Sequence, residues 1–243
     1  MSGAQQGSVT SSGQGESQTI ERSGLTKLMW FGVLQLVSIV AGWALSFYLL
    51  ESVFFNTAAL GLSSSSTPDQ VSAALSGILH DFALLVPILV AIQLVAMASL
   101  TLGYWDLKRV DNRFALPSTL MLLMIIGSAV VAGAFILMIN GLPDVIATAP
   151  VTPNSTPSQD FLTAVGTLIL DLLFVLIGGI VAFVGFVGGQ MLGLWRAGSR
   201  YGETMLKLGA IFPIVPLLNI VAPILVILGT LHAKERVGAP PHA

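Results

Sequence analysis

Long apolar runs alternate with short polar segments along almost the whole chain. Five of these runs are long enough to cross the hydrocarbon core of a bilayer as helices, which takes roughly 20 residues each. They cover about residues 28–50, 82–104, 116–139, 161–195 and 208–231. We therefore predict an all-α, polytopic integral membrane helical bundle with five transmembrane helices, contained within residues 24–233.

Composition points to the bilayer as the solvent of this bundle. Hydrophobic residues make up 54% of the chain and charged residues 9%, whereas soluble domains carry about 25% charged residues. The two ends are polar. Residues 1–23, rich in Ser, Gly and Gln, are predicted to be a disordered cytoplasmic tail because they bury too little apolar surface to offset the entropy of ordering. Residues 234–243 form a short polar tail.

The fourth run is too long for a simple crossing. At 1.5 Å per residue its helix would be about 52 Å long, against a hydrocarbon core of about 30 Å. It should therefore tilt or bend, and the pairs Gly178–Gly179 and Gly188–Gly189 are the expected bend points. Two overlapping G-x-x-x-G repeats predict close helix packing along one stripe. The stripe consists of Gly185, Gly189 and Gly193.

The fifth run is interrupted by Pro213, Pro216 and Pro223. We favour a single proline-kinked span, which would place the C-terminus outside. The alternative is a re-entrant helical hairpin with its tip at Leu217 or Leu218, which would return the C-terminus to the inside. Backbone exposed at such a tip has to be buried among the other helices.

Lys and Arg before the C-terminal tail fall into three clusters, at residues 22–27, 108–113 and 196–207. The loops 51–77 and 140–160 contain neither residue. Because positive residues mark the cytoplasmic side of short loops, we predict a multi-pass membrane protein with a cytoplasmic N-terminus. The only N-x-S/T sequon is at Asn154, in a predicted external loop, and is a candidate for N-glycosylation.

Several function classes are excluded by what the sequence lacks. There is no cysteine, which removes disulfides, thiol catalysis and thiolate metal sites. There is no G-x-S-x-G, H-E-x-x-H or P-loop motif. We therefore predict no catalytic, cofactor-binding or metal site, and not an enzyme. No basic block interleaved with aromatics points to nucleic acid, so the predicted partner is the lipid bilayer.

Asp171 is the most unusual polar residue, because it lies about 15 Å along the fourth apolar run. Carboxylates at such depth usually face a bundle interior and mark proton or cation sites. The alternative is a hydrogen-bonded Asp171 that only packs helices. Gln35, Gln93 and Asn219 are its candidate partners in an intramembrane polar site. Asn219 lies between two prolines, where it either lines a broken helix or caps a kink.

The basic linker has two interpretations. Arg196, Arg200 and Lys207 either meet anionic lipid headgroups or serve only as topology determinants.

Two short segments carry a family resemblance. One begins Tyr201-Gly202-Glu203-Thr204 and continues through the proline-rich run to Leu225; the other is Gly24-Leu25-Thr26-Lys27-Leu28 before the first apolar run. Over roughly residues 24–233 the chain resembles an uncharacterised family of archaeal multi-pass membrane proteins, catalogued as a domain of unknown function. The resemblance implies an archaeal plasma membrane and no established activity.

Two functional expectations follow. The first is a structural, interaction or accessory membrane subunit, which forms a homo-oligomer or joins a partner subunit through the glycine stripe of the fourth helix. The alternative is a small transporter or channel-like protein that uses Asp171 and Asn219.

Overall fold

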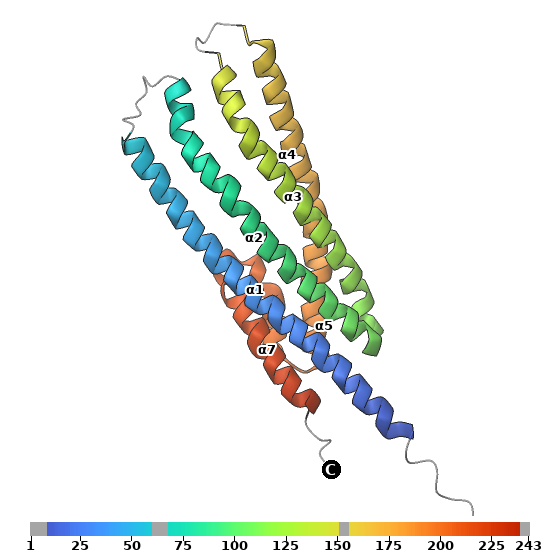
Figure 1. Ribbon diagram of the computed structural model, residues 1–243. Coiled ribbons are helices and arrows are strands. Elements are labelled where there is room, and N and C mark those ends of the chain that lie inside the picture. Colours follow the sequence, from blue (N-terminus) through green and yellow to red (C-terminus); the bar gives the residue numbers. More distant parts are fainter. Residues whose placement is uncertain (1–8, 60–67, 151–155, 239–243) are drawn as a thin grey trace, which may run out of the picture. The chain divides into compact units, whose positions relative to one another are not determined.

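The computed structural model describes residues 9–59, 68–150 and 156–238, and these segments contain helices and no strand. The predicted all-α class is therefore confirmed. The elements in chain order are α1 (Val9–Ala59), α2 (Pro68–Val110), η1 (Asn112–Phe114), α3 (Ala115–Thr148), α4 (Gln159–Gly185), η2 (Phe186–Met191), α5 (Leu192–Arg200), α6 (Thr204–Ile211), η3 (Phe212–Ile214), η4 (Pro216–Leu218) and α7 (Val221–Gly238) (Figure 1).

Four helical segments of the described chain are long and apolar enough to cross a membrane. They are Gly15–Ser52, Leu84–Val110, Asn112–Thr148 and Gln159–Arg200. Each coincides with one of the first four predicted spans. The predicted total of five spans is not confirmed, because the last apolar run does not form a long helix.

The last run instead folds back on itself. α6 and α7 pack against each other, and the short 3₁₀ turns η3 and η4 connect them. Pro213 and Pro216 lack the N–H groups that a continuous helix needs at this point. Gly209 and Gly229 let the two arms approach, since a Cβ at Gly209 would lie 2.9 Å from the Val226 side chain. The kinked single span is thus replaced by a helical hairpin, which was the alternative prediction.

The two ends of this hairpin lie together. Arg236, near the end of α7, donates a hydrogen bond of 2.9 Å to the Tyr201 carbonyl, just before α6 begins. Its guanidinium also lies 2.9 Å from the carboxylate of Glu203, which is buried. Gly202 makes the turn with φ of 68°, a left-handed conformation that favours glycine. The C-terminal end of α7 therefore lies on the same side as the basic linker, and not on the opposite side as a fifth span would require.

The first helix begins earlier than expected. α1 starts at Val9, inside the segment predicted to be a disordered tail. Its early turns are held by tertiary contacts: Glu21 pairs with Arg200, and the Ser23 hydroxyl donates a hydrogen bond of 2.8 Å to Asp106. Contacts of this kind stabilise a helix whose own composition is unfavourable.

The long fourth helix is continuous but irregular. The helical segment Gln159–Arg200 contains the π-helix η2 at Phe186–Met191. This irregularity includes Gly188–Gly189, one of the two expected bend points, whereas Gly178–Gly179 stays within regular α4. π-bulges inside α-helices are a recognised cause of helix distortion.

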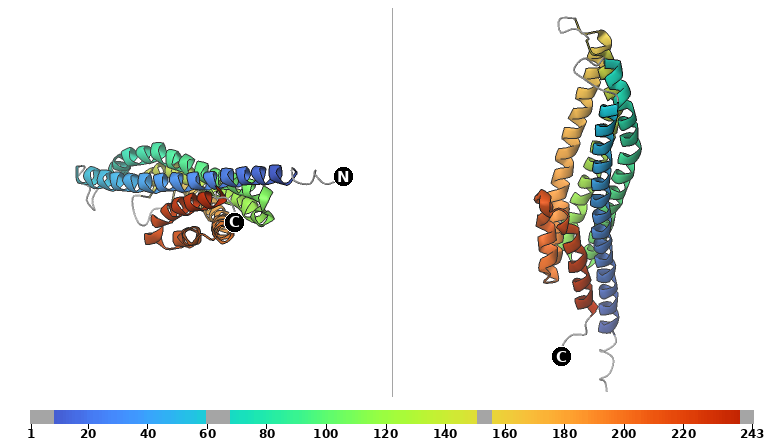
Figure 2. Two further views of the ribbon diagram at one scale, coloured as in Figure 1. Left: turned by 90° about the horizontal axis from the view of Figure 1, so that it is seen from below. Right: turned by 90° about the vertical axis from the view of Figure 1, so that its left-hand side faces the viewer.

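The chain divides into two compact units. Unit 1 contains residues 1–37, 93–125 and 182–243, and unit 2 contains residues 38–92 and 126–181. Unit 1 holds a well-buried core whose fully buried side chains include Phe31, Leu100, Tyr104, Phe114 and Leu206. The Tyr104 and Phe114 rings stack with centroids 5.9 Å apart. In unit 1, α7 lies beside the first half of α1 (Figures 1 and 2).

Unit 2 consists of the end of α1, the start of α2, the end of α3 and the start of α4. Its apolar side chains are mostly exposed, as Phe47 and Leu176 illustrate at 65% and 63%. Among its described residues the buried side chains are few: Leu49, Ala134, Ile139 and Asp171. A carboxylate thus shares the small interior of unit 2 with three apolar residues.

Candidate functional site: an acid-lined cavity in unit 2

Polar side chains recur along one face of α4. Residues three and four apart on a helix lie above one another on the same side. The face carries Asp160, Thr163, Thr167 and Asp171. α4 begins at a capped end, where the Phe161 N–H donates a hydrogen bond of 3.1 Å to Ser158 Oγ. An N-terminal carboxylate such as that of Asp160 is favourable in the first turn of a helix.

The end of α3 faces this stripe. It supplies Met138, Gly141, Asp144 and Thr148, again three or four residues apart. The two helices enclose a cavity of about 440 Å³, within the range of small-molecule sites, roughly 300–1,000 Å³. Asp144 and Asp160 are exposed, so the cavity opens to the surface at its acidic end.

Asp171 is the buried member of the cavity lining. Its side chain is 6% exposed. No described residue donates a hydrogen bond to its carboxyl group or forms an ion pair with it. The Thr163 and Thr167 hydroxyls donate to the carbonyls of Gln159 and Thr163, so they do not serve this carboxyl. Burial of a polar group without a partner costs free energy, and a ligand in the cavity would supply the missing partner.

The arrangement of carboxylates limits what this ligand can be. Within the described segments no three acidic or histidine side chains gather closely enough to hold a metal ion. Asp171 is a single buried carboxyl group, while Asp144 and Asp160 are exposed. Met138, Ala164 and Leu168 supply apolar walls.

Charge is divided unevenly between the two units. All ten Lys and Arg residues of the chain fall in the sequence ranges of unit 1, together with six acidic residues. The other six acidic residues fall in unit 2, which contains no Lys or Arg at all. No Lys or Arg of unit 2 is therefore available to pair with Asp171.

The predicted partners of Asp171 lie elsewhere in the chain. Gln35, Gln93 and Asn219 belong to unit 1, and none of them lines the cavity. Gln93 instead donates a hydrogen bond of 3.2 Å to Gln35. Asn219 lies in the turn between η4 and α7. The sequon residue Asn154 lies outside the described residues, so its glycosylation stays a prediction.

The glycine stripe packs against other helices of the same chain. Gly185 and Gly189 lie against Met124 and Met121 of α3, and Gly193 lies against the Tyr104 ring of α2. Tyr104 also donates a hydrogen bond of 3.3 Å to the Gln190 carbonyl. These contacts belong to unit 1 and pack the fourth helical segment against its neighbours.

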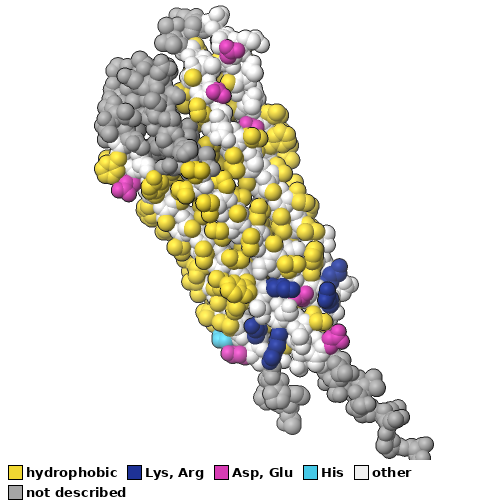
Figure 3. Space-filling view, viewed as in Figure 1, with side chains coloured by type: hydrophobic (Ala, Val, Ile, Leu, Met, Phe, Trp, Pro, Cys, Tyr) yellow, Lys and Arg dark blue, Asp and Glu magenta, His cyan; other side chains and the backbone are white. Residues whose placement is uncertain are grey.

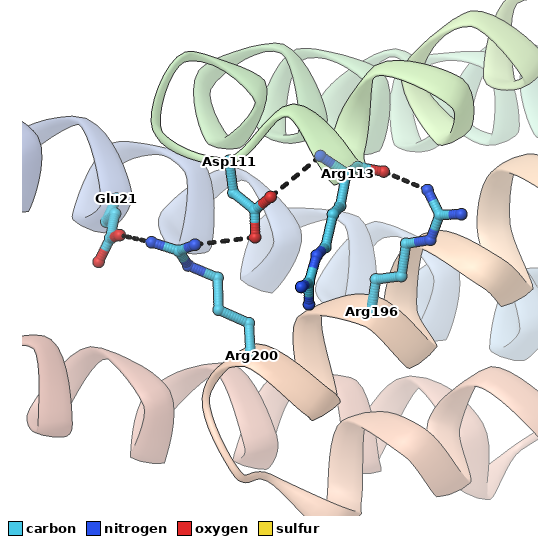
Figure 4. A network of polar contacts seen from close by, with 5 residues as sticks. All are labelled: Glu21, Asp111, Arg113, Arg196 and Arg200. Atoms are coloured by element: carbon cyan, nitrogen blue, oxygen red, sulfur yellow. Dashed lines mark hydrogen bonds and ion pairs between the residues drawn. The ribbon is translucent and has the colours of Figure 1, made fainter.

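A polar network ties three segments of unit 1 together (Figure 4). Arg200 pairs with Glu21 of α1 and, at 2.9 Å, with Asp111. Asp111 also accepts a hydrogen bond of 3.0 Å from the Arg113 N–H. Arg196 donates to the Arg113 carbonyl. Two of the three cations proposed for headgroup contact are thus engaged with other parts of the protein.

The network makes stability depend on pH. The Arg113 N–H, and then the Arg200 guanidinium, lower the pKa of Asp111. An acid with a lowered folded-state pKa stabilises the fold above its ordinary pKa of about 3.9, and this contribution is lost as pH falls through the lowered value. We expect Asp111→Asn to reduce the drop in thermal unfolding midpoint between pH 7 and pH 3 in detergent. An unchanged drop would contradict this role.

The threonines of the cavity are the site residues that sequence reasoning missed. Thr163 and Thr167 lie on the same helical face as Asp171 and Asp160. A count of polar positions at helical spacing in the fourth run would have found them. The contribution of α3 had no comparable signal, because it depends on which helix packs against α4.

The fold and the site define a class: a helical membrane protein, with several apolar helices long enough to span a bilayer. The chain belongs to the family described as "Protein of unknown function (DUF973)", whose model matches residues 19–241. Neither the curated proteins nor the solved structures compared with it gave a match. The resemblance to a domain of unknown function is thus confirmed.

Proposed function

We propose that the chain is a multi-pass protein of the archaeal plasma membrane that binds a small organic ammonium ion from the outer side. Asp171 is the counter-ion. The observation that carries this proposal is a carboxyl group that is 6% exposed, has no partner among the described residues and lines an open cavity. The archaeal source rests on the family resemblance.

A cation suits this cavity for electrostatic reasons. Three acidic residues line it, and unit 2 has no Lys or Arg. A cleft lined by one sign of charge, with low-dielectric walls, concentrates ions of the opposite sign. A cation bound at Asp171 would also offset the cost of burying that carboxylate.

An organic ammonium ion fits better than a metal ion. A hard divalent ion such as Ca²⁺ takes six to eight oxygen ligands, and the described carboxylates do not gather in that way. The cavity is also far larger than a bare ion, at about 440 Å³. A single ammonium group can pair with Asp171 while its apolar body contacts Met138 and Leu168.

Charge along the sequence supports the proposed orientation. The N-terminus, the α2–α3 connection and the α5–α6 linker carry the Lys and Arg clusters, which favours the cytoplasm for these segments. Asp144 and Asp160 flank the α3–α4 connection, which contains no Lys or Arg and is proposed to lie outside. The cavity would then open outward.

The test is stabilisation by a ligand probe. Purified protein in detergent is titrated with ethylammonium chloride, with sodium chloride at equal ionic strength as the reference. A ligand that binds only the folded state raises the unfolding midpoint increasingly as its concentration exceeds its Kd. We expect ethylammonium to stabilise the wild type more than sodium does, and Asp171→Asn to remove the difference.

Two variants sharpen the result. Asp160→Asn, at the open end, should weaken the ethylammonium response without removing it. Glu51→Gln removes an exposed acid of unit 2 that does not line the cavity, and should leave the response unchanged. Equal stabilisation by both salts, or an undiminished response in Asp171→Asn, would contradict the proposal.

A second candidate function is that of an interaction or accessory membrane subunit. It is favoured by the surface of α1: in the most apolar stretch of this helix, only 6% of the residues are buried inside the protein. Trp43 is 56% exposed, and the space beside Gly42 is open. Homo-oligomers or partner subunits should then co-purify in mild detergent, whereas an isolated monomer would count against this role. Transport of the bound cation by Asp171 is the corresponding transporter form of the first proposal.

A further inference from the structure

A second cavity lies within unit 1, between residues 19–26 of α1 and the end of α7. Its volume is about 660 Å³, and it is lined mainly by polar side chains, with Leu231 as its one large apolar member. The two helices pack directly nearby, since a Cβ at Gly32 would lie 3.0 Å from the Pro223 carbonyl. Two cations face this groove, Arg22 of α1 and Lys234 of α7.

Most other cations of unit 1 already have partners. Lys27 pairs with Asp106 at 2.5 Å, Arg236 with Glu203, and Arg200 with two carboxylates. The Lys207 ammonium lies 5.7 Å from the centre of the Trp195 ring. By contrast, Arg22 and Lys234 form no ion pair with any residue that the structure describes. Two unpaired cations at one groove favour an anionic ligand.

The other polar groups of the groove do not replace these two as donors. The Thr19 and Thr26 hydroxyls donate to carbonyls of α1 itself. The Ser23 hydroxyl donates to Asp106. Glu235 is the one acid in the lining, and it opposes an anion. The groove therefore has one net positive charge, and the donors available for an anion are a guanidinium and an ammonium group.

We propose that this groove binds the phosphate group of an anionic lipid. Arg and Lys are the side chains that hold phosphate oxygens, Arg through paired donors and Lys as a point charge. The inference is independent of the cation cavity in unit 2. The linker residues Arg196 and Arg200 are engaged within the protein, whereas Arg22 and Lys234 form no ion pair among the described residues.

A lipid suits the groove better than a soluble phosphate. Leu231, in its wall, is 40% exposed and follows the apolar part of α7. Along α1, Trp30 is 52% exposed and lies two turns beyond Arg22. Tryptophan and basic residues at the end of apolar helices are typical of the headgroup region. On the face shown in Figure 3, Lys and Arg side chains gather in one area beside an extensive hydrophobic surface.

The test compares two lipids and a soluble anion. Detergent-solubilised protein is titrated with phosphatidylglycerol, phosphatidylcholine and glycerol phosphate, and the unfolding midpoint and the lipid retained in native mass spectra are measured. Phosphatidylglycerol should stabilise the wild type and be retained, whereas the other two should have much weaker effects. Equal effects of phosphatidylglycerol and phosphatidylcholine would contradict an anion site. Stabilisation by glycerol phosphate equal to that by phosphatidylglycerol would contradict a lipid as the ligand.

A matched pair of double variants isolates the groove. Arg22→Gln/Lys234→Gln should weaken phosphatidylglycerol binding roughly thirty-fold, since each basic residue near an anionic surface contributes about a fivefold factor. Lys108→Gln/Arg109→Gln removes the same charge from exposed residues outside the groove and should leave most of the affinity. Equal losses of phosphatidylglycerol affinity in the two variants would contradict a specific binding site in the groove.

A third variant keeps the test decisive if the first double variant does not fold. Glu235→Gln removes the opposing carboxylate of the groove and leaves both cations in place. It should strengthen phosphatidylglycerol binding by roughly fivefold. Unchanged or weaker binding in this variant would overturn the proposal.

Discussion

Gly185→Ala is expected to lower the stability of the folded protein strongly. A Cβ at Gly185 would overlap the backbone of Met124, with its Cα at 2.6 Å. Because backbone has no alternative rotamer, the α3 and α4 segments in unit 1 would have to separate. Overpacking of a well-packed core typically costs about 1–3 kcal/mol, and a backbone clash belongs at the upper end. The same substitution in an open helical position is stabilising by roughly 0.5–1 kcal/mol.

Gly133→Ala is the matched control for this prediction. Gly133 lies in α3, and beyond its own turn of helix no described atom lies within 4 Å of the position that its Cβ would occupy. Fluorescence-detected size-exclusion chromatography and thermal unfolding in detergent report the amount and stability of folded protein. We expect a large loss for Gly185→Ala and none for Gly133→Ala. Equal behaviour of the two variants would show that the close contact at Gly185 does not exist.

Asp171→Leu is expected to stabilise the protein while it abolishes the ethylammonium response. If Asp171 served only helix packing, its replacement should instead lower the stability of the protein. A buried carboxyl without a partner carries a desolvation cost, and replacing it with an apolar side chain should recover about 1–3 kcal/mol. Functional sites often retain such a cost. The opposite signs of the two effects separate a binding role from a packing role.

Asp160→Leu is the comparison for this second prediction. Asp160 is exposed at the open end of the same cavity, so its replacement removes no buried charge. The unfolding midpoint of each variant is measured without ligand and then with ethylammonium. A lower midpoint for Asp171→Leu than for the wild type would mean that Asp171 stabilises the fold, and it would favour the helix-packing interpretation.

Hydropathy was sufficient to predict the helices but not their connections in space. Residues 28–50, 82–104, 116–139 and 161–195 all coincide with long apolar helical segments of the structure. Apolar content depends only on local sequence, so a window average detects it. The run 208–231 has the same average character, yet it reverses direction at Pro213 and Pro216. The average contains no information on direction.

The candidate site was predictable only in part. The position of Asp171 deep in an apolar run is visible in the sequence, and it is enough to mark this residue as unusual. Its surroundings depend on which face of α3 packs against α4, and this is a tertiary property. Gln35 and Gln93 are predicted partners of Asp171, whereas the structure pairs them with each other in unit 1. The glycine stripe, in turn, packs against Met121, Met124 and Tyr104.

The charge pattern predicts on which side of the membrane each segment lies, but it does not identify ion-pair partners. Clusters of Lys and Arg indicated which segments should share the cytoplasm. They did not distinguish Arg200, which two carboxylates hold, from Arg22, which has no ion-pair partner among the described residues. That distinction requires the relative positions of α1, η1 and α5.

The most direct measurement of the central claim uses the absence of cysteine from the chain. Thr167→Cys places one thiol in the cavity lining, one helical turn from Asp171. Intact cells are treated with a cationic trimethylammonioethyl methanethiosulfonate or its anionic sulfonatoethyl counterpart. We predict labelling from outside that is at least about tenfold faster for the cation, and a ratio near one in Thr167→Cys/Asp171→Asn. Absence of outside labelling, or a charge preference that persists without the Asp171 carboxylate, would contradict an outward-facing cation site at Asp171.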